Sequence, residues 1–271
     1  MSDGGSYIHG TSPKEQERLT RLNEFLNLAS LRELGPERGA RVLDVGAGLA
    51  QLTRAIARRT GVRVVAIERS RDQLAEALRQ AKDAGEEDRL EMRAGDAYDL
   101  PLRSDEWNTF DIAHARFLLE HLSDPLAVVQ GMVRAVRPGG RVVLEDDDHE
   151  LLRLWPEVPQ VMTVWRAYMQ SYAKAGNDPI VGRRLPELLH RAGAVPSRIT
   201  YLFFGECAGS PNFRAYVDNL AGIFEGAKDA LAEVGLAGER LERGQEELRG
   251  WAERPDAAFW YAVSWAEGIR P

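Results

Sequence analysis

The sequence predicts an α/β fold, built on a Rossmann-like, mostly parallel sheet of seven strands. Short apolar runs alternate with segments of helical periodicity between residues 41 and 145. Parallel strands need long crossover connections, usually helices, so this alternation favours a parallel sheet. A glycine-containing turn, Gly46-Ala47-Gly48, joins the first apolar run to the first of these helices. Polar residues end the next runs, as expected at the ligand-binding edge of such a sheet.

The individual elements follow from periodicity and capping signals. Five runs in the first half are typical of strands, at residues 41–45, 62–68, 89–95, 110–115 and 141–145. Helices are expected between them at about 49–59, 72–84 and 125–136. Ser70 with Gln73 predicts the start of the second helix, and Asp124 with Pro125 predicts the start of the third.

The two ends of the chain differ from this central pattern. Ser12 and Glu15 form a capping box that predicts a first helix, which Gly35-Pro36 ends. After residue 150, helices are expected near 158–174, 185–192, 212–226 and 241–253, and strand-like runs at 197–204 and 257–265 would complete the sheet. We therefore expect three regions: an N-terminal lid helix at 1–36, a ligand-binding core at 37–150, and helical cap insertions with the last strands at 151–271.

Composition excludes several classes of protein. The 271 residues are 44% hydrophobic and 28% charged, with a net charge of −7, which is ordinary for a globular protein and unlike a basic nucleic-acid binder. Apolar stretches fall far short of the roughly 18–20 residues that span a bilayer. Residues 1–6 lack the features of a secretory signal. The lone Cys207 excludes a disulfide framework and a zinc site built from several thiolates. We expect a cytoplasmic protein that acts on a small molecule.

Three successive strand ends carry candidate ligand-binding residues. Glycines in the first turn let the backbone approach a ligand, and the next helix offers unpaired N–H groups. Gln51 stands where a dinucleotide fingerprint needs glycine or alanine, which argues against a nicotinamide oxidoreductase. Glu68 ends the second run and could accept both hydroxyls of a ribose, or could be a solvated carboxylate. Asp96, in Gly95-Asp96-Ala97, could accept from a ligand amine or could cap its own loop.

Together these motifs resemble the class I S-adenosylmethionine-dependent methyltransferases. The resemblance is to the small-molecule group that includes the ubiquinone and menaquinone biosynthesis enzymes. It covers residues 41–146 and rests on the segments 43–48, 67–68, 95–97, 110–112 and 136–140. The family usually has a third glycine where Ala50 stands. Residues 113–117 lack the Asp/Asn-Pro-Pro motif of enzymes that methylate nucleic-acid amines, and the single cysteine does not suit an arsenite methyltransferase.

The resemblance implies a cofactor, S-adenosylmethionine, and residues that bind it. Asp44, Gly46 and Gly48 would surround its methionine part, Glu68 would bind the ribose and Asp96 the adenine amine. Residues 7–10 resemble an N-terminal lid, for which a frayed tail is the alternative. Arg116 could pair with the cofactor carboxylate or with Glu120. The full set of expected cofactor-binding residues is Tyr7, Asp44, Gly46, Ala47, Gly48, Gln51, Glu68, Arg69, Gly95, Asp96, Ala97 and Arg116.

Candidates for catalysis follow the fourth and fifth strands. They are His121, Asp146 and His149. The acidic run 145–148 could be a solvated loop, recognise a cation, supply a base or bind a hard metal ion, and His121 could be structural. We expect no metal, with Asp146 facing the pocket and Asp147 and Asp148 solvated.

The predicted activity is methyl transfer to a small organic acceptor by a monomer or homodimer, without nucleic-acid or membrane partners. Two alternatives keep the same fold and cofactor. One is a different reaction, such as a cyclisation with a structural cofactor, and the other is cofactor binding without turnover.

Overall fold

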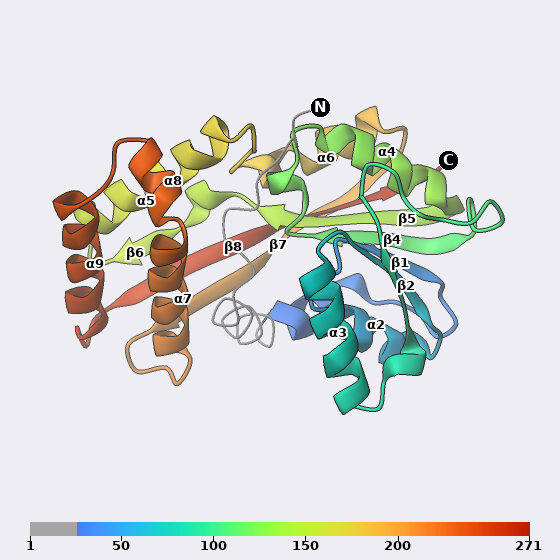
Figure 1. Cartoon of the computed structure of the whole chain (residues 1–271), viewed down its shortest axis with the longest axis horizontal. Helices are drawn as coiled ribbons and strands as arrows, with labels where there is room; N and C mark the ends of the chain where they lie inside the picture. Colours follow the sequence, from blue (N-terminus) through green and yellow to red (C-terminus); the bar gives the residue numbers. More distant parts are fainter. Residues whose placement is uncertain (1–25) are drawn as a thin grey trace.

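The computed structural model describes residues 26–271 and has one mixed sheet at its centre (Figure 1). Its strands are β1 (Val42–Val45), β2 (Val64–Glu68), β3 (Leu90–Ala94), β4 (Phe110–Arg116), β5 (Val136–Asp147), β6 (Arg153–Trp155), β7 (Val195–Cys207) and β8 (Ala258–Ile269). The order is β3-β2-β1-β4-β5-β8-β6, and β7 pairs with β8. Strands β1 to β5 are parallel, whereas β8 is antiparallel to its three neighbours. The predicted mostly parallel α/β sheet is confirmed, and the short β6 is an addition to the seven predicted strands.

The helices lie close to their predicted positions. They are α2 (Gln51–Thr60), α3 (Arg71–Asp83), α4 (Pro125–Ala135), α5 (Pro159–Lys174), α6 (Leu185–Arg191), α7 (Phe213–Gly226), α8 (Lys228–Glu233) and α9 (Glu239–Ala252), and residues 26–34 are also helical. The Ser70 and Asp124 side chains cap α3 and α4 as predicted. Within residues 26–271, no helix combines the length and apolarity needed to cross a membrane.

Two apolar layers cover the faces of the sheet. On one face α4 and α6 pack over β1, β4, β5 and β8, and on the other face α2 and the helix at residues 26–34 form a second layer (Figure 1). These layers bury the alternating aliphatic residues of the central strands. The carboxyl ends of β1, β2, β4 and β5 are thereby held at one edge of the sheet.

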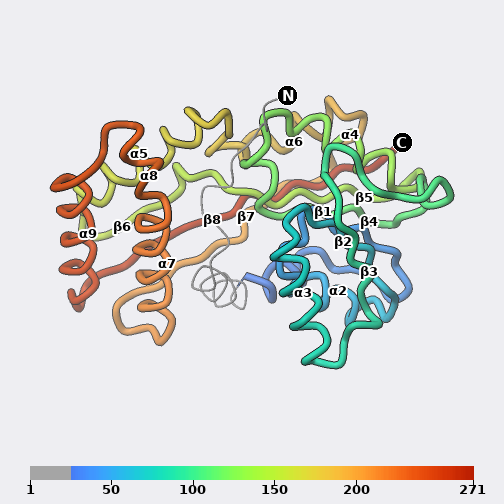
Figure 2. The backbone as a smooth tube through the Cα atoms, in the orientation of Figure 1, coloured from blue at the N-terminus to red at the C-terminus, as the bar shows by residue number. Residues whose placement is uncertain are grey.

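A third apolar cluster forms the cap. It joins α5, α7, α8 and α9 with residues of β6 and β8. Figures 1 and 2 show these helices gathered at one end of the molecule, and the long strand β8 runs from there into the central sheet. Most of the cap's aromatic side chains point inward, which accounts for the many aromatic residues after residue 150.

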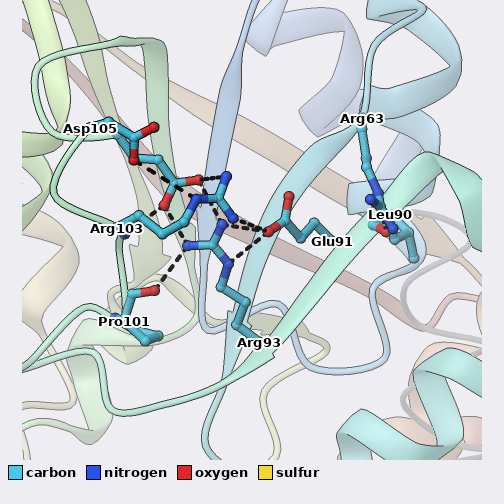
Figure 3. A network of polar contacts seen from close by, with 8 residues as sticks. Arg63, Leu90, Glu91, Arg93, Pro101, Arg103 and Asp105 are labelled. Carbon is cyan, nitrogen blue, oxygen red and sulfur yellow. Dashed lines mark hydrogen bonds and ion pairs between the residues drawn. The ribbon is translucent and has the colours of Figure 1, made fainter.

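An arginine–glutamate network holds the loop that follows β3 (Figure 3). Arg93 donates to both carboxylate oxygens of Glu106, at 2.6 and 2.7 Å, and to the carbonyl oxygen of Pro101 at 2.9 Å. A Cβ built on Gly95 would lie 2.5 Å from Cγ of Pro101, so this loop packs directly against the chain just after β3. The network therefore fixes the segment that contains Asp96.

We expect Arg93→Ala to lower the free energy of unfolding by about 3 kcal/mol, because it removes the main partner of a buried charge. Glu106 is only 2% exposed, and Arg103, its remaining partner, is largely solvated. The control is Arg79→Ala on α3, whose side chain is 61% exposed, and whose ion pairs are worth less than about 1 kcal/mol. Urea unfolding of both variants measures the difference, and equal losses would contradict a structural role for the network.

Candidate functional site

The glycine turn after β1 is held tightly against its neighbours. The amide groups of Gly46 and Ala47 donate to the carbonyl oxygen of Ile67, at 2.9 and 3.0 Å. Gly46 has a φ of 75°, and a Cβ there would lie 3.1 Å from the Leu118 side chain. Ala50, at the position where the family usually has glycine, also adopts a left-handed conformation, with a φ of 53°. The turn thus keeps the expected shape and touches the loop after β4.

Glu68 joins this turn to the start of α3. Its Oε2 accepts a hydrogen bond from Gly48 N at 2.9 Å, and its Oε1 accepts from Ser70 N at 2.7 Å. Glu68 is 9% exposed, so the alternative of a solvated carboxylate is wrong. It lies at the edge where a ribose would bind, and that contact stays a prediction.

The other cofactor candidates lie around this edge in different environments. Asp96 is exposed and its Oδ1 accepts from Tyr98 N at 3.0 Å, so it does cap its own loop. Gly95 N donates to the Glu68 carbonyl oxygen. Gln51 donates to Gln80, Arg69 is exposed and Ala97 packs against the core. Tyr7 and the proposed lid segment lie outside the described residues.

Asp44 belongs to a buried charge network that sequence reasoning did not find. Its Oδ2 accepts from the Thr53 hydroxyl at 2.6 Å, and its Oδ1 lies 3.0 Å from His114 Nδ1. On the other side of the imidazole, Glu145 Oε2 lies 3.8 Å from Nε2. Burial opposes the charge on His114, but the hydrogen bond to Asp44 and the nearby carboxylate of Glu145 raise its pKa to about 9. The available signal was His114 itself, a titratable residue between two alanines in the mainly apolar run 110–115.

Arg116 extends this network to the first helix. It donates to Asn27 Oδ1 at 2.8 Å and to Ser30 Oγ at 3.2 Å, and Ser30 donates to Glu145 at 2.8 Å. Burial lowers the pKa of Arg116, although the carboxylates of Glu145 and Asp44 oppose that shift. Residues 26–34 are therefore anchored to the ends of β4 and β5, and a contact of Arg116 with the cofactor stays a prediction.

We expect the free energy of unfolding to fall as the pH rises from about 6.5 to about 9. In the folded protein His114 keeps its proton up to about pH 9, whereas in the unfolded chain it loses the proton near pH 6.5. The stabilisation from His114 is complete below pH 6.5 and amounts to at most about 3 kcal/mol. Urea unfolding of the wild type and of His114→Gln across this range isolates the effect. An imidazole NMR titration of His114 with a midpoint below 7 would refute the assignment.

A cavity of about 180 Å³ lies beyond the loop at residues 117–121. Its walls come mainly from apolar side chains of α5, α7, α9, β7 and β8. Its polar end is formed by Glu120, His121, Asp147, His149 and Tyr261. Because Leu118 packs against Gly46, the same loop borders the glycine turn on one side and the cavity on the other.

Hydrogen bonds fix the polar end of the cavity. His149 Nε2 lies 3.0 Å from Glu120 Oε2, and its Nδ1 lies 3.0 Å from the Tyr261 hydroxyl. The His149 backbone is also held, since its carbonyl oxygen accepts from the Trp165 indole at 2.7 Å. Burial raises the pKa of Glu120 to about 8 and lowers the pKa of His149. At neutral pH Glu120 is therefore mostly protonated and His149 is neutral.

His121 is a second histidine beside Glu120. Its Nε2 lies 3.5 Å from Glu120 Oε1. Burial, together with the neighbouring His149, lowers the pKa of His121 to about 3. His121 is thus a neutral group at the cavity wall, and its catalytic role stays a prediction.

The expected orientation of the acidic run is wrong. Asp146 does not line the cavity; its Oδ2 accepts from Leu118 N and Leu119 N, at 3.1 and 2.7 Å. Asp147 lines the cavity instead, and Asp148 is buried in an ion pair with Arg183 at 2.7 Å. Strand β5 extends through Asp147, so alternation along the strand directs Asp146 and Asp147 to opposite faces.

Three groups at the cavity could together hold a metal ion. Ligand atoms of Glu120, Asp147 and His149 all lie within 4.8 Å of one another. They come from the ends of two strands, whereas the sequence suggested a single carboxylate cluster. The expectation that no metal takes part stays a prediction.

Comparison with known proteins agrees with this geometry. Residues 43–144 match the family model described as a methyltransferase domain. The matched segment contains the glycine turn, Glu68, Asp96 and the loop at residues 117–121. Residues 43–144 form a methyltransferase domain.

Two curated relatives resemble the methyltransferase domain and its surroundings. The chain is 32% identical to methyltransferase GfsG of Streptomyces halstedii over 54% of its length and 51% of that protein. It is 31% identical to the demethylmenaquinone methyltransferase of Clavibacter sepedonicus over 56% of both proteins. The chain thus spans about half the length of these relatives.

Solved structures share the fold over nearly the whole chain. The geranyl diphosphate C-methyltransferase of Streptomyces coelicolor, in complex with Mg²⁺, geranyl diphosphate and S-adenosylhomocysteine, has a TM-score of 0.56 and 16% identity, covering 93% of this chain and 78% of that one. The [4+2]-cyclase SpnF has a TM-score of 0.51 and 18% identity, covering 100% of this chain and 88% of that one.

S-adenosylmethionine is the cofactor of this domain, and the residues at the sheet edge fit it. The left-handed glycines leave room for close approach of a ligand to the backbone. Glu68 and Asp96 place carboxylates beside that turn and at the next strand end. A methyl donor held there would lie beside the loop at residues 117–121.

We expect Glu68→Ala to weaken binding of S-adenosylhomocysteine at least tenfold, because each hydrogen bond to the carboxylate is worth about 1.5–3 kcal/mol. The variant also loosens the glycine turn, so Glu68→Gln, which keeps one acceptor oxygen, should lose less affinity. Asp88→Ala, an exposed carboxylate just before β3, is the control. Calorimetry that gives equal affinities for the wild type and Glu68→Ala would remove Glu68 from the site.

Proposed function

We propose that the protein transfers the methyl group of S-adenosylmethionine to a small, largely apolar acceptor in the cavity. One observation carries this proposal: the loop at residues 117–121 borders both the glycine turn and the cavity. Methyl transfer requires the donor and the acceptor to meet in line, and two adjoining sites that share one bordering loop can bring them together. The net charge of −7 and a cavity with mainly apolar walls support a small molecule rather than a nucleic acid.

The residues of this chain would contribute mainly by positioning. The bound cofactor supplies an electrophilic methyl group on sulfur. Glu68 and the glycine turn would orient it, and Asp146 would hold the loop that borders both ligands. Apolar walls would exclude water and align the acceptor, so that the attacking atom forms a bond to the methyl carbon as the carbon–sulfur bond breaks.

A base is needed where the acceptor atom carries a proton. Glu120 and His149 are hydrogen-bonded to each other at the cavity wall. The ionised form of Glu120, which dominates above a pKa of about 8, can take up that proton beside the neutral imidazole of His149. We therefore assign the base to this pair, with Tyr261 orienting the imidazole.

Two other functions use the same fold. One is a cyclisation in which the cofactor is structural, and the other is cofactor binding without turnover. Incubation with labelled S-adenosylmethionine and candidate acceptors separates them. Only methyl transfer forms S-adenosylhomocysteine in step with a methylated product.

We expect Glu120→Gln to lower kcat about 100-fold, a typical contribution of general acid–base catalysis, while the affinity for S-adenosylhomocysteine is unchanged. In the wild type, kcat/KM should rise with pH through about 8 as Glu120 loses its proton. This rise should be absent in the variant. Asp148→Asn, which alters the ion pair with Arg183 away from the cavity, is the control. Equal, small losses in both variants would contradict the assignment.

A further inference from the structure

The polar end of the cavity is rich in acidic groups. Glu120 and Asp147 line it, and His149 lies between buried aromatic rings beside them. Among residues 26–271, no lysine or arginine lines the cavity. A ligand that carried a carboxylate or phosphate would therefore meet two carboxyl groups without a compensating cation.

Asp147 has an unused hydrogen-bonding atom at this position. Its Oδ1 is buried and accepts no hydrogen bond within the described part of the chain. A buried acceptor without a donor costs about 1–3 kcal/mol. The structure of the free protein thus leaves an oxygen that a ligand's donor would satisfy.

A hydroxyl and a protonated amine could each donate to these acids, and they differ in the number of hydrogen-bond donors that they bring. Ligand atoms of Glu120, Asp147 and His149 lie within 4.8 Å of one another, close enough to surround one small group. A hydroxyl brings one donor, whereas a protonated amine brings up to three N–H donors and a positive charge. Trp165, Tyr168 and Tyr261 also line the cavity, and aromatic rings attract a cation that lies over them.

We propose that the reacting group of the acceptor is an amine, which enters as an ammonium ion between Glu120 and Asp147. This inference rests on the proposed methyl transfer. The rest of the acceptor would be apolar, because Leu220, Trp251 and Phe259 form the wall away from the acids.

The reaction balances with groups already in the cavity. The ammonium ion gives one proton to the ionised Glu120, which frees the nitrogen lone pair. That pair attacks the methyl carbon, a carbon–nitrogen bond forms, and the carbon–sulfur bonding electrons remain on sulfur as S-adenosylhomocysteine. The product is a methylated ammonium ion, and the proton on Glu120 leaves to solvent.

Three probes with the same apolar body test this assignment: phenethylamine, phenethyl alcohol and hydrocinnamate. Each is titrated into the protein with saturating S-adenosylhomocysteine and followed by tryptophan fluorescence, since Trp165 and Trp251 line the cavity. We expect the amine to bind at least tenfold more tightly than the alcohol, and hydrocinnamate to bind more weakly than both. Equal binding of amine and alcohol would overturn the amine assignment and leave methyl transfer intact.

Variants test whether Asp147 causes the preference for the amine over the alcohol. Asp147→Asn should reduce binding of the amine at least tenfold with little change for the alcohol, and Asp148→Asn should change neither. Unchanged amine binding in Asp147→Asn would contradict the proposal. Folding is checked by S-adenosylhomocysteine affinity, which should equal that of the wild type. A wild-type protein that binds no S-adenosylhomocysteine would instead refute the proposed function itself.

A metal ion is the competing occupant of the same three groups. The amine titration is repeated after dialysis against a chelator and again with added Zn²⁺ or Mg²⁺. We expect chelation to leave amine binding unchanged and the added metal not to improve it. Amine binding that requires the metal would overturn the proposal.

Discussion

Two backbone amides that share one buried carboxylate oxygen shape both halves of the site. Leu118 N and Leu119 N donate to Asp146 Oδ2, which fixes the loop between β4 and α4. Leu118 then packs against Gly46, and Glu120 and His121 face the cavity. The glycine turn and the cavity are therefore positioned by the same short segment. Asp146 acts by holding the backbone, and its own side chain does not line the cavity.

The ends of β1, β4 and β5 contain two contrasting groups of charges. In the first, Asp44 and Glu145 flank His114, and Arg116 adds a second positive group nearby. The charges there compensate one another, so the network can be buried and can anchor the first helix. In the second, Glu120 and Asp147 lie at the cavity, where burial raises the pKa of both carboxyls. Uncompensated acids in a cavity are typical of a functional site rather than of a stabilising one.

The cap gives the acceptor cavity its apolar walls. Helix α5 follows β6, whereas α7 and α9 come from later in the chain, between β7 and β8. They meet in one cluster because their aromatic faces can be buried only against one another and against the end of β8. Tyr261 lies on β8 and reaches His149, which follows β5. The polar end of the cavity thus depends on the antiparallel strand as well as on the parallel core.

The sequence by itself determined the parallel core and the sheet edge that carries the glycine turn. Alternating periodicities, the glycine turn and acidic residues at strand ends are local patterns, which can be recognised without knowing the tertiary contacts. Only the tertiary structure decided which acid faces the cavity and which supports the loop, because Asp146 and Asp147 differ by one position in a strand and therefore point to opposite faces. It also decided the partners of His149, since Glu120 and Tyr261 reach it from distant segments. Contacts between segments far apart in the chain leave no periodic signal, so the cavity emerges only when the sheet and the cap are assembled.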